Sequence, residues 1–254
     1  MFTIKNGEFL DNFFNHLYDY TLISYDNICK LILDDYSNYF SHIFSEKEIM
    51  TIIVLNKSYF QNQIAFFELI KMEMTIPAFI SLRSAIEALR LFRVYFTDID
   101  FRNKYTENTN FDFTNNFDYY SFKQSKVNKV IKQQYDEIKN LNEIPLSSIC
   151  FNNEYIELSD LHSELSKWAH LLNINMLLSI NVNDNKIYMG IEDKINVTLQ
   201  NHIKKYLEAS YIILFLHETS FLPLISGFSK EHYEKSLELK NQYDQFINLF
   251  YKRK

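Results

Sequence analysis

Residues 77–93 of the chain read PAFISLRSAIEALRLFR, and this stretch decides the fold. Apolar residues occupy nearly every side of the helix that this pattern predicts, which is typical of a helix at the centre of a domain. Pro77 is tolerated because it falls in the first turn. Arg83, Glu87 and Arg90 recur at i, i+4 and i+7, so they share one stripe of this helix. Because an unpaired buried charge costs several kcal/mol, we expect these charges to be paired.

The composition of the chain favours helices throughout. The 254 residues include 3 Gly and 3 Pro, and this share of Gly is far below the typical ~7%. So few turn-forming residues argue against an all-β sandwich or barrel, and against a Gly-rich phosphate-binding loop. Hydrophobic residues make up 47%, and we interpret the 23 Phe and 18 Tyr as core side chains that take the place of Leu. The sequence therefore predicts a mainly all-α protein, a multi-helix bundle.

Apolar periodicity and capping signals place the elements along the chain. The predicted helices cover residues 8–38, 45–74, 76–96, 122–140, 157–172, 194–221 and 229–252. Residues 98–120 are rich in Asn, Asp and Thr, which indicates an irregular excursion with one short helix. Residues 176–190 predict a small β-hairpin insertion, with its strands within 177–190. No repeat or long linker divides the chain, so we expect one helical domain over residues 1–254.

The charge and the cysteines of the chain restrict the cellular compartment and the partners that we expect. The 26 basic and 32 acidic residues give a net charge of −6, which argues against non-specific nucleic-acid binding by bulk electrostatics. Cys29 and Cys150 match no metal-ligand spacing, so we interpret them as buried free thiols. The first residues lack a signal-peptide pattern, and the apolar run 211–216 is far short of the ~20 residues of a membrane span. We expect a cytoplasmic protein with no membrane partner, no metal and no cofactor.

A second helix carries a polar face that matches the stripe of residues 77–93. Within residues 158–170, His162, Ser166 and His170 fall at i, i+4 and i+8, and leucines with Trp168 supply the packing. The simplest arrangement sets the two polar faces against each other. We therefore predict a buried or cleft-lining cluster of Arg83, Glu87, Ser166 and His170.

The two motifs together resemble a bacterial family of unknown function. They are Ser-Leu-Arg-Ser-Ala-Ile-Glu-Ala at residues 81–88 and Leu-Ser-Lys-Trp-Ala-His at residues 165–170. The family has one helix with Arg-x-x-x-Glu and a later helix with Ser-x-x-x-His. It looks related to the all-helical HEPN superfamily, which includes ribonuclease toxins and phage-defence effectors. The resemblance covers about residues 45–220 in helix order and implies a HEPN-like bundle with the functional set Arg83, Glu87, Ser166 and His170.

The resemblance also implies an activity and partners. It implies that the chain is a metal-independent endoribonuclease and that its substrate is RNA. It also implies a homodimer, and a cognate antitoxin or adaptor as a further partner. His170 would act as general acid or base, Arg83 would stabilise the phosphate in the transition state, and Glu87 would orient one of them. HEPN ribonucleases carry Arg followed by His on one helix, a spacing that this chain lacks. Arg and His would therefore have to meet from different helices.

Further residues are candidates for binding, and two interpretations of the cluster stay open. The candidate binding residues are Arg90, His162, Lys126 and Lys129. The two lysines belong to a basic edge over residues 123–132 that is either a solvated helix face or an RNA-phosphate contact surface. His217-Glu218 lacks the second His of a zinc-protease helix, which excludes that class. In the first interpretation the cluster acts on RNA. In the second the chain is a non-enzymatic helical adaptor or small-ligand sensor, and the cluster is a structural ion pair or a ligand pocket.

Overall fold

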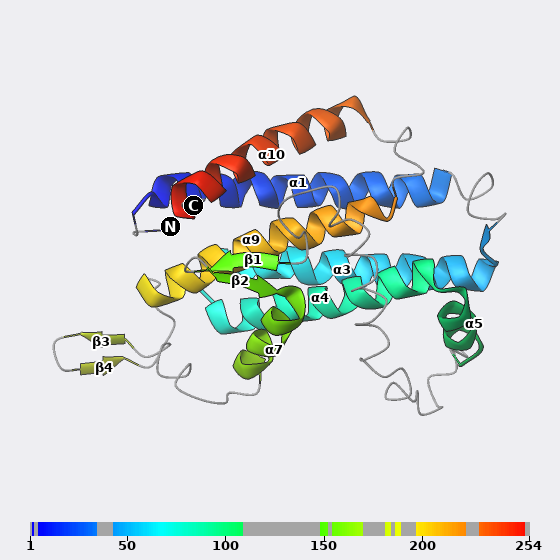
Figure 1. The fold of residues 1–254 in the computed structure, drawn as a ribbon, viewed down its shortest axis with the longest axis horizontal. Coiled ribbons are helices and arrows are strands. Elements are labelled where there is room, and N and C mark those ends of the chain that lie inside the picture. Colours follow the sequence, from blue (N-terminus) through cyan, green and yellow to red (C-terminus); the bar gives the residue numbers. More distant parts are fainter. Residues whose placement is uncertain are drawn as a thin grey trace.

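Seven helices make up most of the described chain in the computed structural model (Figure 1). The structure describes residues 2, 5–34, 43–108, 148–151, 154–169, 181–183, 186–188, 197–221 and 229–251. The helices are α1 (Gly7–Asp34), α3 (Glu46–Lys71), α4 (Thr75–Thr97), α5 (Ile99–Asn108), α7 (Leu158–Ala169), α9 (Val197–Thr219) and α10 (Lys230–Phe250). They pack as a bundle, which confirms the predicted all-α class.

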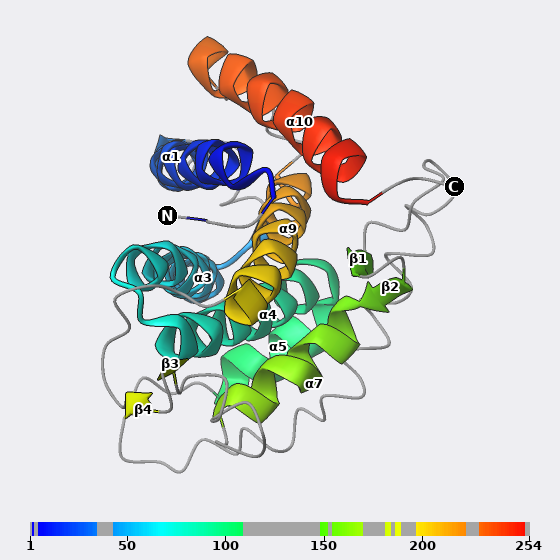
Figure 2. The same cartoon turned by 90° about the vertical axis from the view of Figure 1, so that its left-hand side faces the viewer.

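Helix α4, which contains the stretch 77–93, lies at the centre of the packing. It contacts α3, α5, α7 and α9, and α9 in turn contacts α1. Figure 2 shows α9 between the α1–α10 side of the molecule and the side formed by α4 and α7. Phe79, Leu82 and Phe92 of α4 are fully buried. This helix is therefore apolar on most sides because it has neighbours on most sides.

Helices α3 and α4 form an antiparallel hairpin whose ends are set by local chemistry. At the start of α3, the Glu48 N–H donates to Ser45 Oγ (3.4 Å) and the Ser45 N–H donates to the Glu48 carboxylate (2.7 Å). This reciprocal pair is the predicted capping box. At the other end, Glu73 adopts φ 60°, a left-handed conformation that lets the chain turn back into α4. Pro77 lies in the first turn of α4, as predicted.

Ser45→Ala is expected to lower the free energy of unfolding by about 1 kcal/mol, because it removes the acceptor of one helix N–H group. Urea denaturation monitored by circular dichroism measures the change. Ser58→Ala in the middle of the same helix is the matched control and should change it by no more than a few tenths of a kcal/mol. Equal effects of the two substitutions would contradict the role of the cap.

Two short antiparallel strand pairs accompany the helices. β1 (Ser148–Phe151) pairs with β2 (Glu154–Glu157), and β3 (Asn181–Asn183) pairs with β4 (Lys186–Tyr188). The second pair lies within the hairpin predicted over residues 176–190. The first pair is absent from the sequence-based prediction. The predicted helix over 122–140 and residues 109–120 of the irregular excursion lie outside the described residues, and α5 is the short helix expected in that excursion.

Aromatic and polar contacts fix how the outer helices dock. Phe13 of α1 stacks on Phe246 of α10 with ring centroids 4.9 Å apart, and Tyr211 of α9 stacks on Tyr243 of α10 at 4.0 Å. Between α3 and α9, the buried side chain of Gln63 donates from Nε2 to the main-chain oxygen (3.0 Å) and to Oγ (2.9 Å) of Ser210. The core is therefore rich in aromatic rings and also contains a buried pair of hydrogen bonds between a side chain and a neighbouring helix.

Candidate functional site

A carboxylate, a guanidinium and an imidazole meet between α4 and α7. Glu87 Oε1 accepts a hydrogen bond from Arg83 Nη2 at 2.9 Å and another from His162 Nε2 at 2.7 Å. Arg83 and Glu87 are one helical turn apart on α4, whereas His162 is 75 residues further along the chain. The predicted approach of the two polar faces thus brings together Arg83, Glu87 and His162, which we call the α4–α7 triad.

The α4–α7 triad is partly open to solvent. The exposed fractions of the side chains are 25% for Arg83, 36% for Glu87 and 11% for His162. The hydrogen bond from His162 and the charge of Arg83 lower the pKa of Glu87, although burial opposes this shift. The carboxylate therefore stays ionised near neutral pH. Arg83 Nε–H is buried and meets no acceptor within the part of the chain that the structure describes, so the guanidinium has donors beyond those that Glu87 engages.

Apolar packing holds α7 in place against α4. Leu161, Leu165 and Trp168 are buried, and the Trp168 indole meets Phe79 of α4 edge-on, with ring centroids 5.0 Å apart. These residues occupy the face of α7 that the apolar pattern predicts, and His162 follows Leu161 at the edge of that face. The position of the imidazole beside Glu87 is therefore a consequence of helix packing.

The other predicted site residues lie as follows. Ser166 Oγ donates to the main-chain oxygen of His162, one turn back in α7, at 2.8 Å, so this bond is local to its own helix. Arg90 is buried on α4, with 8% exposure. His170, Lys126 and Lys129 lie outside the described residues, and the expected approach of His170 to Arg83 stays a prediction.

The opposite side of α7 carries a second charged network. Glu164 accepts from Lys205 Nζ at 2.5 Å and from the Tyr206 hydroxyl at 2.9 Å, both on α9. The Tyr206 hydroxyl in turn accepts from the Trp168 indole N–H at 3.0 Å. The side chain of Lys205 is 1% exposed and that of Glu164 is 26% exposed, so the ammonium of this pair is withdrawn from water and the carboxylate is half-buried. Helix α7 is thereby held from both sides, by Glu87 of α4 and by Lys205 of α9.

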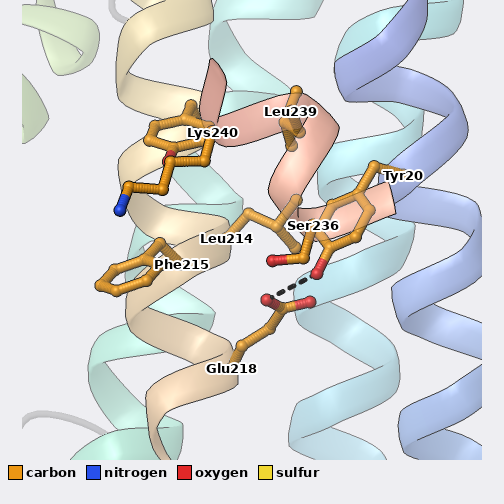
Figure 3. Close-up of a pocket in the computed structure, with 8 residues that line it drawn as sticks. Tyr20, Leu214, Phe215, Glu218, Ser236, Leu239 and Lys240 are labelled. Carbon is orange, nitrogen blue, oxygen red and sulfur yellow. Dashed lines mark hydrogen bonds between the residues drawn. The ribbon is translucent and has the colours of Figure 1, made fainter. Parts of the chain in front are cut away.

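A third polar group, which the local sequence pattern does not predict, lies between α1, α9 and α10. The Glu218 carboxylate accepts from the Tyr20 hydroxyl at 3.0 Å and from the Ser24 hydroxyl, and His232 Nε2 lies 3.4 Å from Oε1. Burial raises the pKa of Glu218 to about 7. The same burial lowers the pKa of His232, which favours its neutral form. Figure 3 shows this carboxylate at the base of a small cavity.

The neighbouring residue His217 is buried among aromatic rings. Its exposure is 0%, and it stacks on Tyr59 with ring centroids 4.4 Å apart and an interplanar angle of 9°. Neither ring nitrogen has a hydrogen-bond partner among the described residues. Burial, helped by the charge of Arg93, lowers the pKa of His217 to about 3. The sequence carries one sign of this polar group, because His217 and Glu218 directly follow the apolar run 211–216. Polar and charged residues in a buried helix need hydrogen-bond or ionic partners.

Comparisons with known proteins do not place the chain in a family. No family model, no curated protein and no solved structure matched it. In the described residues, no helix is long and apolar enough to cross a membrane. The same residues contain no group of three or more His, Cys, Asp or Glu side chains arranged to hold a metal ion.

Proposed function

We propose that the chain is a HEPN-like protein of bacterial defence or toxin type that acts on RNA, and that the α4–α7 triad is its active site. The observation that supports this is the shared oxygen: Glu87 Oε1 joins the guanidinium of Arg83 to the imidazole of His162. An Arg and a His side chain thus meet from different helices, as the missing Arg–His spacing on one helix requires. The homodimer and the antitoxin or adaptor partner belong to the same proposal.

The exposure of the triad favours a functional role over a structural one. An ion pair with side chains exposed by 25% and 36% contributes only ~0–1 kcal/mol to stability. The Arg83–Glu87 pair is stable at a surface without a third group, so stability does not explain why His162 joins it. The side chains of Arg83 and His162 keep exposed fractions of 25% and 11%, so both reach solvent in part.

The triad supplies the groups that metal-independent RNA cleavage needs. With Nε2–H donated to Glu87, His162 carries its lone pair on Nδ1 and can take the proton of the RNA 2′-hydroxyl. The 2′-oxygen then attacks the adjacent phosphorus, and the 5′-oxygen leaves with a proton returned by the imidazolium. Arg83 offsets the negative charge that grows on the phosphate oxygens, and Glu87 orients the imidazole. The products are a 2′,3′-cyclic phosphate and a 5′-hydroxyl.

Incubation of single-stranded RNA with the purified chain in EDTA is expected to yield these products. His162→Gln should lower the cleavage rate by about 10²–10⁴-fold, the usual contribution of a general acid–base group. Thermal unfolding should change little, because the pairs that the triad makes are partly exposed. His16→Gln on α1, which replaces another partly exposed histidine, is the matched control and should cleave at the wild-type rate.

Further variants separate the members of the site. Arg83→Lys should reduce cleavage strongly, since an ammonium does not replace a planar guanidinium beside a phosphate. Ser166→Ala should have little effect, because its hydroxyl bonds to its own helix. Loss of cleavage in His170→Ala with normal thermal unfolding would restore the residue set that the family resemblance implies. RNA that stays intact with wild-type protein would refute the ribonuclease proposal.

A small-ligand sensor remains the second candidate function. The observation that favours it is the cavity above Glu218, which is separate from the α4–α7 triad.

A further inference from the structure

The cavity between α1, α9 and α10 has a charged floor and aromatic walls (Figure 3). Its volume is about 50 Å³. Its lining comprises Tyr20, Tyr211, Leu214, Phe215, Glu218, Ser236, Leu239 and Lys240. Tyr20 is buried, whereas Phe215 is 40% exposed and marks the open side. A small ligand can therefore enter beside Phe215 and reach the carboxylate.

The charge of Glu218 is not balanced by the groups that hold it. Within the described residues, its carboxylate contacts two hydroxyls, those of Tyr20 and Ser24, and the imidazole of His232, whose pKa burial lowers. Lys240 lines the cavity, but Figure 3 shows its amino group directed away from the carboxylate. A buried carboxylate without a cation is costly, and the pKa of Glu218 rises to about 7 for that reason. A cation in the cavity would remove this cost.

Size and hydrogen-bond geometry restrict the kind of cation. A water molecule needs ~10–15 Å³ measured in the same way, so the cavity holds roughly four non-hydrogen atoms. Each oxygen of Glu218 already accepts one hydroxyl, from Tyr20 at Oε2 and from Ser24 at Oε1. A guanidinium that binds both oxygens would compete with both hydroxyls, whereas an ammonium needs one remaining lone pair. The rings of Tyr20, Tyr211 and Phe215 add favourable surfaces for a cation with an apolar tail.

We propose that the cavity between α1, α9 and α10 binds the ammonium group of a small primary amine, with Glu218 as its counter-ion. The hydroxyl of Ser236 offers a second acceptor, and the alkyl tail lies along Phe215 toward solvent. This site is independent of the α4–α7 triad and of any activity on RNA. It gives the chain a means of responding to an amine through the contact between α9 and α10.

Calorimetric titration of the full chain with ethylammonium chloride, at an ionic strength held constant with sodium chloride, tests the proposal. A ligand of three heavy atoms binds weakly, so we expect saturable binding with a dissociation constant of about 1 mM or above. Ethanol has the same size without the charge, and tetramethylammonium has the charge without a donor. Neither should bind. Equal heats from ethylammonium and tetramethylammonium would show that binding does not require an N–H donor and would overturn the proposal.

Variants assign the binding to the cavity. Glu218→Gln should abolish binding, since the amide keeps the size and loses the charge. Ser236→Leu fills the cavity from α10 and should also abolish binding while Glu218 stays in place, which guards against a folding defect in the first variant. Lys240→Met should tighten binding several-fold, because it removes a like charge from the rim. Glu238→Gln on the exposed side of α10 is the matched control and should bind as wild type. Persistent binding in Glu218→Gln and Ser236→Leu would overturn the site.

Discussion

Glu164→Gln is expected to lower the free energy of unfolding by about 3 kcal/mol, because it removes the negative charge that faces Lys205 inside the bundle. Lys205 Nζ lies 2.5 Å from Glu164 Oε2, and the Lys205 side chain is 1% exposed. The Tyr206 hydroxyl also loses a charged acceptor. Lys205→Met should destabilise by a similar amount, and the double variant should lose much less than the sum. Urea denaturation of the four proteins gives the coupling energy of the pair.

The exposed pair between Lys230 and Glu234 provides the matched cycle. These side chains are 3.3 Å apart on α10 and are 89% and 63% exposed, so their coupling should be about 0.5 kcal/mol or less. Equal coupling energies for the two pairs would show that burial of Lys205 does not matter. A large value for the Glu164 pair would establish that α7, and with it His162, is fixed from the side of α9.

His217→Phe is expected to make the protein more resistant to acid. The folded state holds the pKa of His217 at about 3, below the 6.5 of an unperturbed histidine. Between pH 6.5 and 3 the unfolded chain therefore binds a proton that the folded chain does not, and stability falls as the pH falls. The loss is ~1.4 kcal/mol per pH unit. Phenylalanine retains an aromatic ring beside Tyr59 and Phe92 and does not titrate.

The advantage of His217→Phe over wild type should grow by about 3 kcal/mol between pH 7.5 and 4.5. Urea denaturation at a series of pH values measures it. Burial also lowers the pKa values of His202 and His232. It raises the pKa of Glu218, and this shift alone makes stability fall as the pH rises from 4.5 to about 7. These groups are present in both proteins and cancel in the difference. Parallel curves for the two proteins would contradict the assignment.

The sequence predicts the Arg83–Glu87 pair because their spacing of one helical turn is a local property. The choice between His162 and His170 as its partner is not local. In the helix predicted over residues 157–172 these histidines are eight residues apart, which is about 12 Å along the axis, so the longitudinal position of that helix on α4 decides which of them is predicted to lie nearest Glu87. That position is set by contacts such as Phe79 with Trp168. A single sequence therefore predicts which residues form the polar face of each helix, but not how far one helix is displaced along the other.

The surroundings of Glu218 show the same limit at longer range. A charged residue after the apolar run 211–216 signals that a partner is needed, but its partners Tyr20 and His232 belong to α1 and α10. The contact with Tyr20 spans 198 positions of the chain, and nothing in the local pattern of either segment points to the other. The strands β1 and β2, of four residues each, were not predicted from the sequence.

The hydrogen bonds of Gln63 bear on how uniquely this core is assembled. An interior of interchangeable aromatic and aliphatic side chains tolerates sliding of one helix past another, since many alignments bury similar apolar area. A slide of α9 by one turn, about 5.4 Å, would strand the Gln63 amide opposite carbon atoms. That amide finds both of its acceptors on a single residue, Ser210. The two bonds of Gln63 therefore favour the observed alignment of α3 and α9 over alignments shifted by a turn, and this alignment sets where the groups on α9 meet their neighbours.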